Sequence, residues 1–89
     1  MKVTNMASNR TGREVANQFT IYGDNGEVYF QSYNSIIAKR ADGKVYLDER
    51  YWNYSSTTGK YRNQFLGETK RETEAKIKAG IYEIVNLNS

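Results

Sequence analysis

The dipeptide Asn25-Gly26 is the feature of this sequence that most constrains its fold. It separates two runs in which apolar and polar residues alternate. Asn-Gly between such runs predicts a type I′ hairpin turn, because both residues tolerate a positive φ angle. We therefore expect antiparallel strands over about residues 17–24 and 27–33.

Two further features extend this hairpin into a meander of three or four strands. A third β-branched run, Ile36-Ile37-Ala38, follows a polar break at Asn34-Ser35. That break either turns the chain or forms a bulge in one long strand. The sequence Ala41-Asp42-Gly43-Lys44 then predicts a second tight turn, after which Val45 and Leu47 share one face of the next strand.

The second half of the chain carries start and stop signals for two short helices. Hydroxyl side chains over 55–58 are candidate N-caps, and a helix of about 58–66 would end at Gly67. Thr69 and Glu72 match a capping box that starts a second helix. Residues 81–87 then read as a last strand. We predict an α+β fold: a small antiparallel sheet of four to five strands, covered on one face, with two short helices between the last two strands.

The N-terminal residues differ from the rest because their apolar residues show no regular spacing. Residues 1–16 are polar, so we expect a polar N-terminal arm fixed near Val15. A single α+β domain is then expected over residues 17–89.

The composition removes several classes of chemistry. The chain has no Cys and no His, which leaves out thiolate chemistry, the usual zinc ligands and every scheme that uses imidazole as a general acid or base. We therefore expect neither an enzyme nor a cofactor. No apolar run approaches the roughly 20 residues that span a bilayer, and no signal-type segment follows Met1. A cytosolic protein without membrane contact is expected.

The stretch from Trp52 to Leu66 is the densest in aromatic, hydroxyl and cationic side chains. Residues 51–71 hold four basic and one acidic side chain. A helix N-terminus beside cations suits phosphate or carboxylate, although capping preferences favour hydroxyls that only cap the helix. Cations interleaved with aromatics are also typical of nucleic-acid contacts. The candidate residues for binding a partner or nucleic acid are Tyr54, Ser55, Thr57, Thr58, Lys60, Arg62, Asn63, Lys70 and Arg71.

Two segments resemble motifs of a known group of proteins. Ser32-Tyr33-Asn34-Ser35-Ile36-Ile37-Ala38 and Tyr54-Ser55-Ser56-Thr57-Thr58-Gly59-Lys60 are similar to the paired motifs Ser-Tyr-Asn-Ser/Thr-x-Ile/Val-Ala and Tyr-Ser-x-Thr-Thr-x-Lys. These occur in small, mostly uncharacterised proteins of bacteriophages and mobile elements. The similarity covers about residues 17–87. Relatives often have His where this chain has Tyr61, so no role that needs an imidazole is carried over.

The resemblance implies a phage accessory protein made in the cytoplasm of the bacterial host. Small inhibitors of host defence, including anti-CRISPR proteins, are common in that class. The leading interpretation is a non-enzymatic protein that inhibits a host defence system by binding a host protein or nucleoprotein complex through residues 54–63. The alternatives are a small basic nucleic-acid-binding protein that uses the same residues, and a structural phage component.

Overall fold

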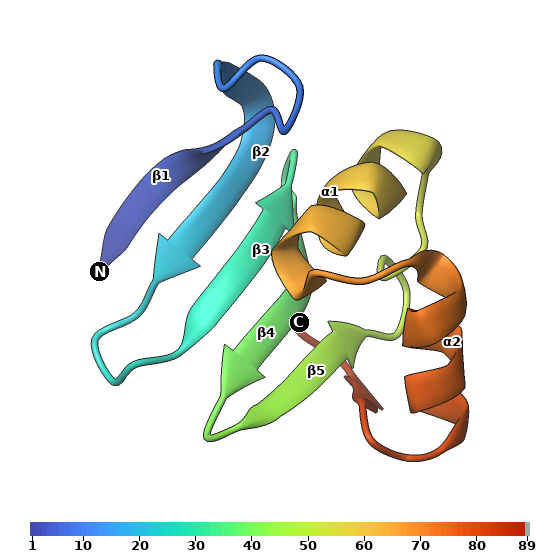
Figure 1. The fold of residues 1–89 in the computed structure, drawn as a ribbon. Coiled ribbons are helices and arrows are strands. Elements are labelled where there is room, and N and C mark those ends of the chain that lie inside the picture. Colours follow the sequence, from blue (N-terminus) through green and yellow to red (C-terminus); the bar gives the residue numbers. More distant parts are fainter. Residues whose placement is uncertain (89) are drawn as a thin grey trace.

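The computed structural model describes residues 1–88 and confirms the α+β class. One six-stranded sheet has its strands in chain order, and α1 lies across β3 and β4 (Figure 1). No helix in the described part of the chain has the length and apolar character to cross a membrane. The elements are β1 (Lys2–Ala7), β2 (Glu14–Tyr22), β3 (Val28–Ser32), β4 (Ser35–Ala41), β5 (Lys44–Asp48), α1 (Ser56–Leu66), α2 (Lys70–Lys78) and β6 (Glu83–Val85).

The sheet has more strands than the sequence predicted, and it is mixed rather than antiparallel. Strands β1 to β5 pair in antiparallel fashion, whereas β6 runs parallel to β5. The chain passes through α1 and α2 between β5 and β6. Such a long connection returns the chain to the end of the sheet at which β5 began, which is what a parallel neighbour requires.

The additional strand arises from the segment expected to be a polar arm. Strand β1 pairs with β2, with Val3 opposite Ile21, and Met6 is only 7% exposed. The sheet therefore begins at Lys2. An edge strand with one buried apolar side chain gives almost no alternation in sequence, which is why this strand was missed. Strand β2 also begins earlier than predicted, and its alternation is broken at Asn17, where φ is 65°.

Both predicted hairpins are present, although one turn differs from the expectation. Asp42 and Gly43 have φ angles of 53° and 75° between the paired residues Ala41 and Lys44, as a two-residue turn requires. At the first hairpin, the Gly23 amide donates to the Glu27 carbonyl at 2.8 Å. The loop is thus longer than a type I′ turn.

The polar break between β3 and β4 turns the chain, so the alternative of a bulge in one long strand is wrong. Ser32 pairs with Ser35, so the chain turns at Tyr33-Asn34. Ile37 is then an extra residue between two paired positions, which makes a bulge in β4.

The helix signals are confirmed, with small shifts in the first helix. Ser55 is the N-cap of α1, where its side chain accepts from the Thr58 amide, and Gly67 ends the helix with a φ of 70°. Thr69 and Glu72 form the complete capping box of α2. Helix α1 therefore starts two residues before the predicted position.

The core lies between the sheet and α1. The Phe30 and Leu47 side chains are fully buried, and the Phe65 ring stacks on Phe30 with centroids 5.8 Å apart. The six buried core residues are Met6, Phe30, Ile37, Ala38, Leu47 and Tyr61. Burial of such side chains is the main stabilising term in a domain of this size.

The alternate positions of the strands form the opposite face of the sheet. A cross-strand row runs from Ile21 through Tyr29 and Lys39 to Tyr46. The Lys39 ammonium lies 5.6 Å from the centre of the Tyr29 ring and 5.7 Å from that of Tyr46. A cation thus lies between two aromatic rings on this face.

If β1 is an integral strand, Met6→Ala should lower the free energy of unfolding by about 2 kcal/mol, because it leaves a cavity in the core. Val3→Ala is the matched control on the same strand. Val3 is 57% exposed, so its truncation should change stability by less than about 0.5 kcal/mol. Urea unfolding measures both variants. Equal midpoints for Met6→Ala and the unmodified protein would show that residues 1–7 do not pack on the domain.

Candidate functional site

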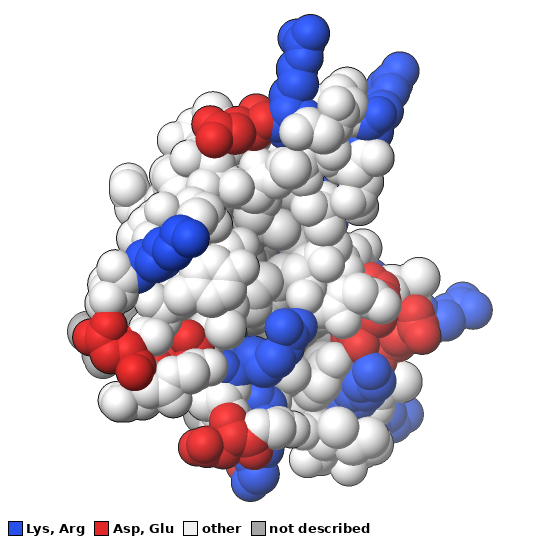
Figure 2. Space-filling model, turned by 60° about the vertical axis from the view of Figure 1, so that its left-hand side comes forward, with Lys and Arg blue, Asp and Glu red and all other residues white. Residues whose placement is uncertain are grey.

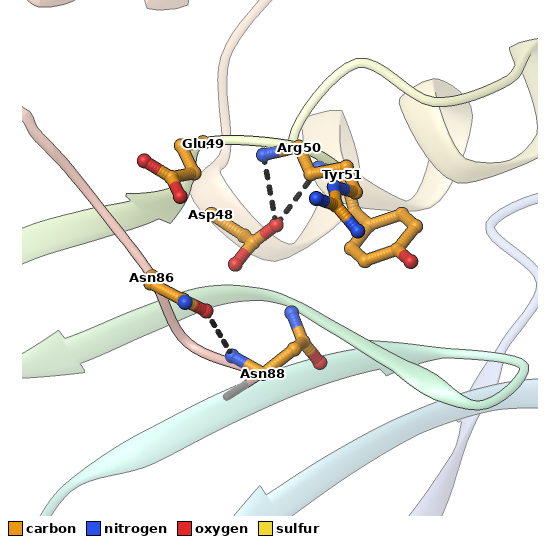
Figure 3. Close-up of a pocket in the computed structure, with 6 residues that line it drawn as sticks. All are labelled: Asp48, Glu49, Arg50, Tyr51, Asn86 and Asn88. Carbon is orange, nitrogen blue, oxygen red and sulfur yellow. Dashed lines mark hydrogen bonds between the residues drawn. The ribbon is translucent and has the colours of Figure 1, made fainter.

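A small hollow on the surface is organised by a buried carboxylate (Figure 3). Asp48 is 1% exposed, and its two oxygens accept from the backbone amides of Arg50, Tyr51 and Leu87 at 2.8–3.0 Å. This network holds Leu87 against the end of β5. The hollow has a volume of about 170 Å³ and is lined by Asp48, Glu49, Arg50, Tyr51, Asn86 and Asn88.

The charge of Asp48 is stabilised by these contacts. Burial raises the pKa of its carboxyl, but hydrogen bonds from the Leu87 backbone, the Asn88 side chain and the backbones of Tyr51 and Arg50 outweigh burial. The pKa therefore lies below its ordinary value. The carboxylate is an acceptor with a structural role rather than an acid poised to give up a proton.

Glu68, between the two helices, is held in the same way. Its carboxylate accepts from Thr73 Oγ1 and Lys76 Nζ at 2.6 Å and from the Tyr82 hydroxyl at 2.8 Å. Burial raises the pKa of Glu68, and the hydrogen bonds from Lys76, Thr73 and Tyr82 lower it by more. Glu68 therefore fixes α2 and the chain after it against the end of α1.

Arg62 was predicted to be available to a partner or nucleic acid, but the structure buries it in the protein itself. Its side chain is only 1% exposed. The Nη1 atom donates to the Trp52 carbonyl at 2.8 Å, and the guanidinium carbon lies 5.3 Å from the centre of the Trp52 ring. The side chain folds under the loop before α1 because that loop offers a carbonyl and an aromatic face. A guanidinium remains charged even when it is buried.

The other predicted residues divide into structural and exposed ones. Thr58 is buried and bonds to Ser32 Oγ at 3.0 Å, and Ser55 caps the helix. These two hydroxyls hold α1 in place. Asn63 is half-buried, with its Oδ1 accepting from Arg62 at 3.0 Å. The exposed members of the set are Tyr54, Thr57, Lys60, Lys70 and Arg71, together with the capping residue Ser55.

Two segments far apart in sequence meet in a groove of about 420 Å³. Tyr33 and Tyr54 on its walls are 52% and 67% exposed, and the Tyr51 ring meets that of Tyr54 edge-on with centroids 5.5 Å apart. We call this hollow the tyrosine groove. It is lined by Ser32, Tyr33, Asn34, Ser35, Ile37, Tyr51, Tyr54 and Thr58.

Tyr33 adopts a backbone conformation that residues other than Gly, Asn and Asp seldom take. Its φ is 55°, and a left-handed conformation costs about 1–2 kcal/mol. Two bonds hold it there: the Tyr33 amide donates to the Asn17 carbonyl, and Gln31 Nε2 donates to the Tyr33 carbonyl, each at 2.7 Å. Tyr33 and Tyr51 were missing from the predicted set. The signal for Tyr33 was its place in the first of the two resembled motifs.

A second and larger groove lies beside the first turn of α1. It has a volume of about 630 Å³, and we call it the α1 groove. It brings together five predicted residues and leaves out Tyr54, Thr57, Thr58 and Arg71. Its lining is Asn53, Ser55, Ser56, Gly59, Lys60, Arg62, Asn63 and Lys70.

Charged side chains do not form one continuous patch on the face shown in Figure 2, where basic and acidic groups alternate around an uncharged centre. Among residues 1–88, no three carboxylates gather in a way that would hold a metal ion.

The carboxylate of Asp48 should make stability depend on pH. Because its pKa is lowered on folding, its stabilisation is complete above the pKa of the unfolded chain, about 3.9, and is lost as the pH falls through the folded value. Asp48→Asn should reduce the free energy of unfolding by about 1–3 kcal/mol at neutral pH and flatten this acid dependence. Urea unfolding at several pH values measures both effects, with the exposed Glu49→Gln as control. An unchanged acid dependence in Asp48→Asn would contradict the assignment.

A family model described as a family of unknown function, DUF8033, matches residues 1–81. This match includes β1 and the lining of both grooves up to Lys70. No curated protein and no solved structure matches the chain significantly. Since the family model covers nearly the whole chain, the protein belongs to the DUF8033 family.

Proposed function

We propose that the protein is a non-enzymatic binding module that acts on a host protein or nucleoprotein complex through the tyrosine groove. The observation that carries this proposal is the meeting of two exposed tyrosines, Tyr33 and Tyr54, at one hollow. Tyrosine combines a large apolar ring with a polar edge, and it is enriched among the residues that dominate protein interfaces.

The groove is organised before any partner arrives. The buried bond between Ser32 and Thr58 ties β3 to α1 at its base. Tyr33 is held by its hydrogen bonds with Asn17 and Gln31. The ring of Tyr54 packs edge-on against that of Tyr51. Side chains that are already ordered lose less conformational entropy on association, so such a surface binds more tightly for its area.

The backbone of Tyr33 supports a role in binding. Strained residues persist where the surrounding structure holds them, and they cluster at sites that contact ligands. A half-exposed ring gains little from burial within its own domain. The two-residue turn between Ser32 and Ser35 accounts for the positive φ itself. What supports binding is that a half-exposed tyrosine, and not glycine, occupies this turn position.

The target proposed here is a bacterial defence system, with the protein as a phage inhibitor of the anti-CRISPR kind in the host cytoplasm. This part of the proposal is supported by the resemblance of the segments 32–38 and 54–60 to phage proteins. Both segments line the tyrosine groove. A non-enzymatic mode of action is supported by Asp48 and Glu68, whose oxygens are already engaged by several donors.

The double variant Tyr33→Ala/Tyr54→Ala should lose the partner while keeping its fold, since both side chains are largely outside the core. Immobilised protein exposed to host lysate treated with nuclease, followed by quantitative mass spectrometry, measures retention of each bound protein. The control is Tyr22→Ala, because Tyr22 is 45% exposed on β2 and does not line the groove. Equal retention by the double variant and the unmodified protein, or equal loss in Tyr22→Ala, would overturn the assignment of this surface.

Tyr33→Gly should leave the free energy of unfolding unchanged or raise it by up to about 1 kcal/mol, because glycine adopts a positive φ without strain. Asn34→Gly is the matched control at the neighbouring turn position, where φ is not positive; it should lower stability by a few tenths of a kcal/mol. Thermal unfolding of the two variants tests this. A loss of more than about 1 kcal/mol in Tyr33→Gly would show that the ring serves the fold.

A further inference from the structure

The α1 groove carries positive charge without any acidic side chain in its lining. Lys60 and Arg62 contribute to its lining from α1, and Lys70 contributes from the start of α2. Within residues 1–88, none of the three makes an ion pair with a carboxylate. The remaining lining residues offer hydroxyls, amides and a glycine. The lining of the groove therefore has cations and polar groups but no acidic side chain. The carboxylates of Glu74 and Glu68 act on Arg62 from outside this lining, without forming an ion pair with it.

Arg62 is the most unusual member of this lining. Its guanidinium is buried, its acceptors are the neutral oxygens of Trp52, Asn53 and Asn63, and its Nε atom has no hydrogen-bond partner among the described residues. Buried cations are normally paired with an anion, because leaving one unpaired is costly. The bond to Asn53 Oδ1 is long, at 3.4 Å, so an anionic oxygen could replace this acceptor.

The first turn of α1 adds the positive end of a helix dipole. It contains no acidic side chain, in contrast to α2, whose first turn holds Glu72. The Ser55 hydroxyl accepts a hydrogen bond from the Thr58 amide. The preceding amides of Ser56 and Thr57 have no acceptor within the helix. Such free amides are suited to an anion.

Gly59 leaves room beside the guanidinium. A Cβ atom at this position would lie 3.6 Å from Arg62 Nη2 and 3.8 Å from Nη1, in ordinary van der Waals contact. Residue 59 therefore adds no side-chain atoms against Arg62, which is 1% exposed in the described structure. An alanine here would fill that space without forcing the helix to move.

From these four observations we infer that the α1 groove binds a phosphate group. The donors belong to three separate groups: the N-terminus of α1, the Arg62 guanidinium, and the ammonium groups of Lys60 and Lys70. This arrangement suits a tetrahedral group with several charged oxygens better than a planar carboxylate with two. The site is separate from the tyrosine groove, so it does not depend on the function proposed for that surface.

Pyrophosphate is the probe, and amide chemical shifts in two-dimensional NMR spectra at low ionic strength are the readout. We expect saturable shifts concentrated at Ser56, Thr57 and Gly59. Lys60→Ala/Lys70→Ala should weaken binding about tenfold, because it removes two cations beside the bound charge. The control Lys2→Ala/Lys78→Ala removes the same net charge outside the groove and should have little effect.

Gly59→Ala separates binding from folding. It should stabilise α1, because alanine is the better helix former, while weakening pyrophosphate binding several-fold by filling the space beside Arg62. A higher free energy of unfolding together with an unchanged affinity for pyrophosphate would contradict the proposed location of the phosphate site. Shifts that do not saturate, or equal losses in the Lys60/Lys70 and Lys2/Lys78 variants, would overturn the site itself.

Parallel titrations identify the source of the phosphate. A nucleoside triphosphate that binds as pyrophosphate does indicates a small phosphate ligand. A single-stranded oligonucleotide that binds more tightly, with an affinity that falls steeply with salt, indicates a nucleic-acid backbone. Citrate at matched ionic strength tests the chemical class, since equal binding of this carboxylate would contradict selectivity for phosphate.

Discussion

The packing of α1 on β3 and β4 is the contact on which both grooves depend. The Phe65 ring stacks on Phe30 in the core, and the hydroxyls of Thr58 and Ser32 bond beneath the first turn. These contacts fix both the axis of the helix and the position of its N-terminus. Thr58 faces the tyrosine groove while its neighbour Gly59 faces the α1 groove, so one helical turn forms a wall of each.

The parts of the fold that could be predicted from sequence are those specified by neighbouring residues. Asp42-Gly43 determines a turn, and Thr69 with Glu72 determines where a helix begins, because all the interacting groups lie within four residues. Strand β1 and the direction of β6 depend on pairing between distant segments. No local pattern specifies such pairing, and a polar edge strand gives little alternation to detect.

Most of the predicted binding residues line one of the two grooves, but not all of their side chains face outward as expected. Hydroxyl and cationic side chains near α1 were expected to face a partner, whereas Ser55, Thr58 and Arg62 are largely engaged by the protein itself. Burial of a charged Arg could not be foreseen, because it depends on the Trp52 loop lying across the helix. Tyr33 was overlooked since the strain in its backbone is visible only in three dimensions.

The lysine between two tyrosines on the helix-free face of the sheet has a consequence for solubility. Broad faces rich in aromatic and β-branched side chains tend to stack on one another. Two copies of this protein that stacked through Tyr29 and Tyr46 would have to remove both Lys39 ammonium groups from water, at a cost of several kcal/mol for each ion. Lys39 therefore lets the sheet present its rings to solvent while opposing self-association through that face.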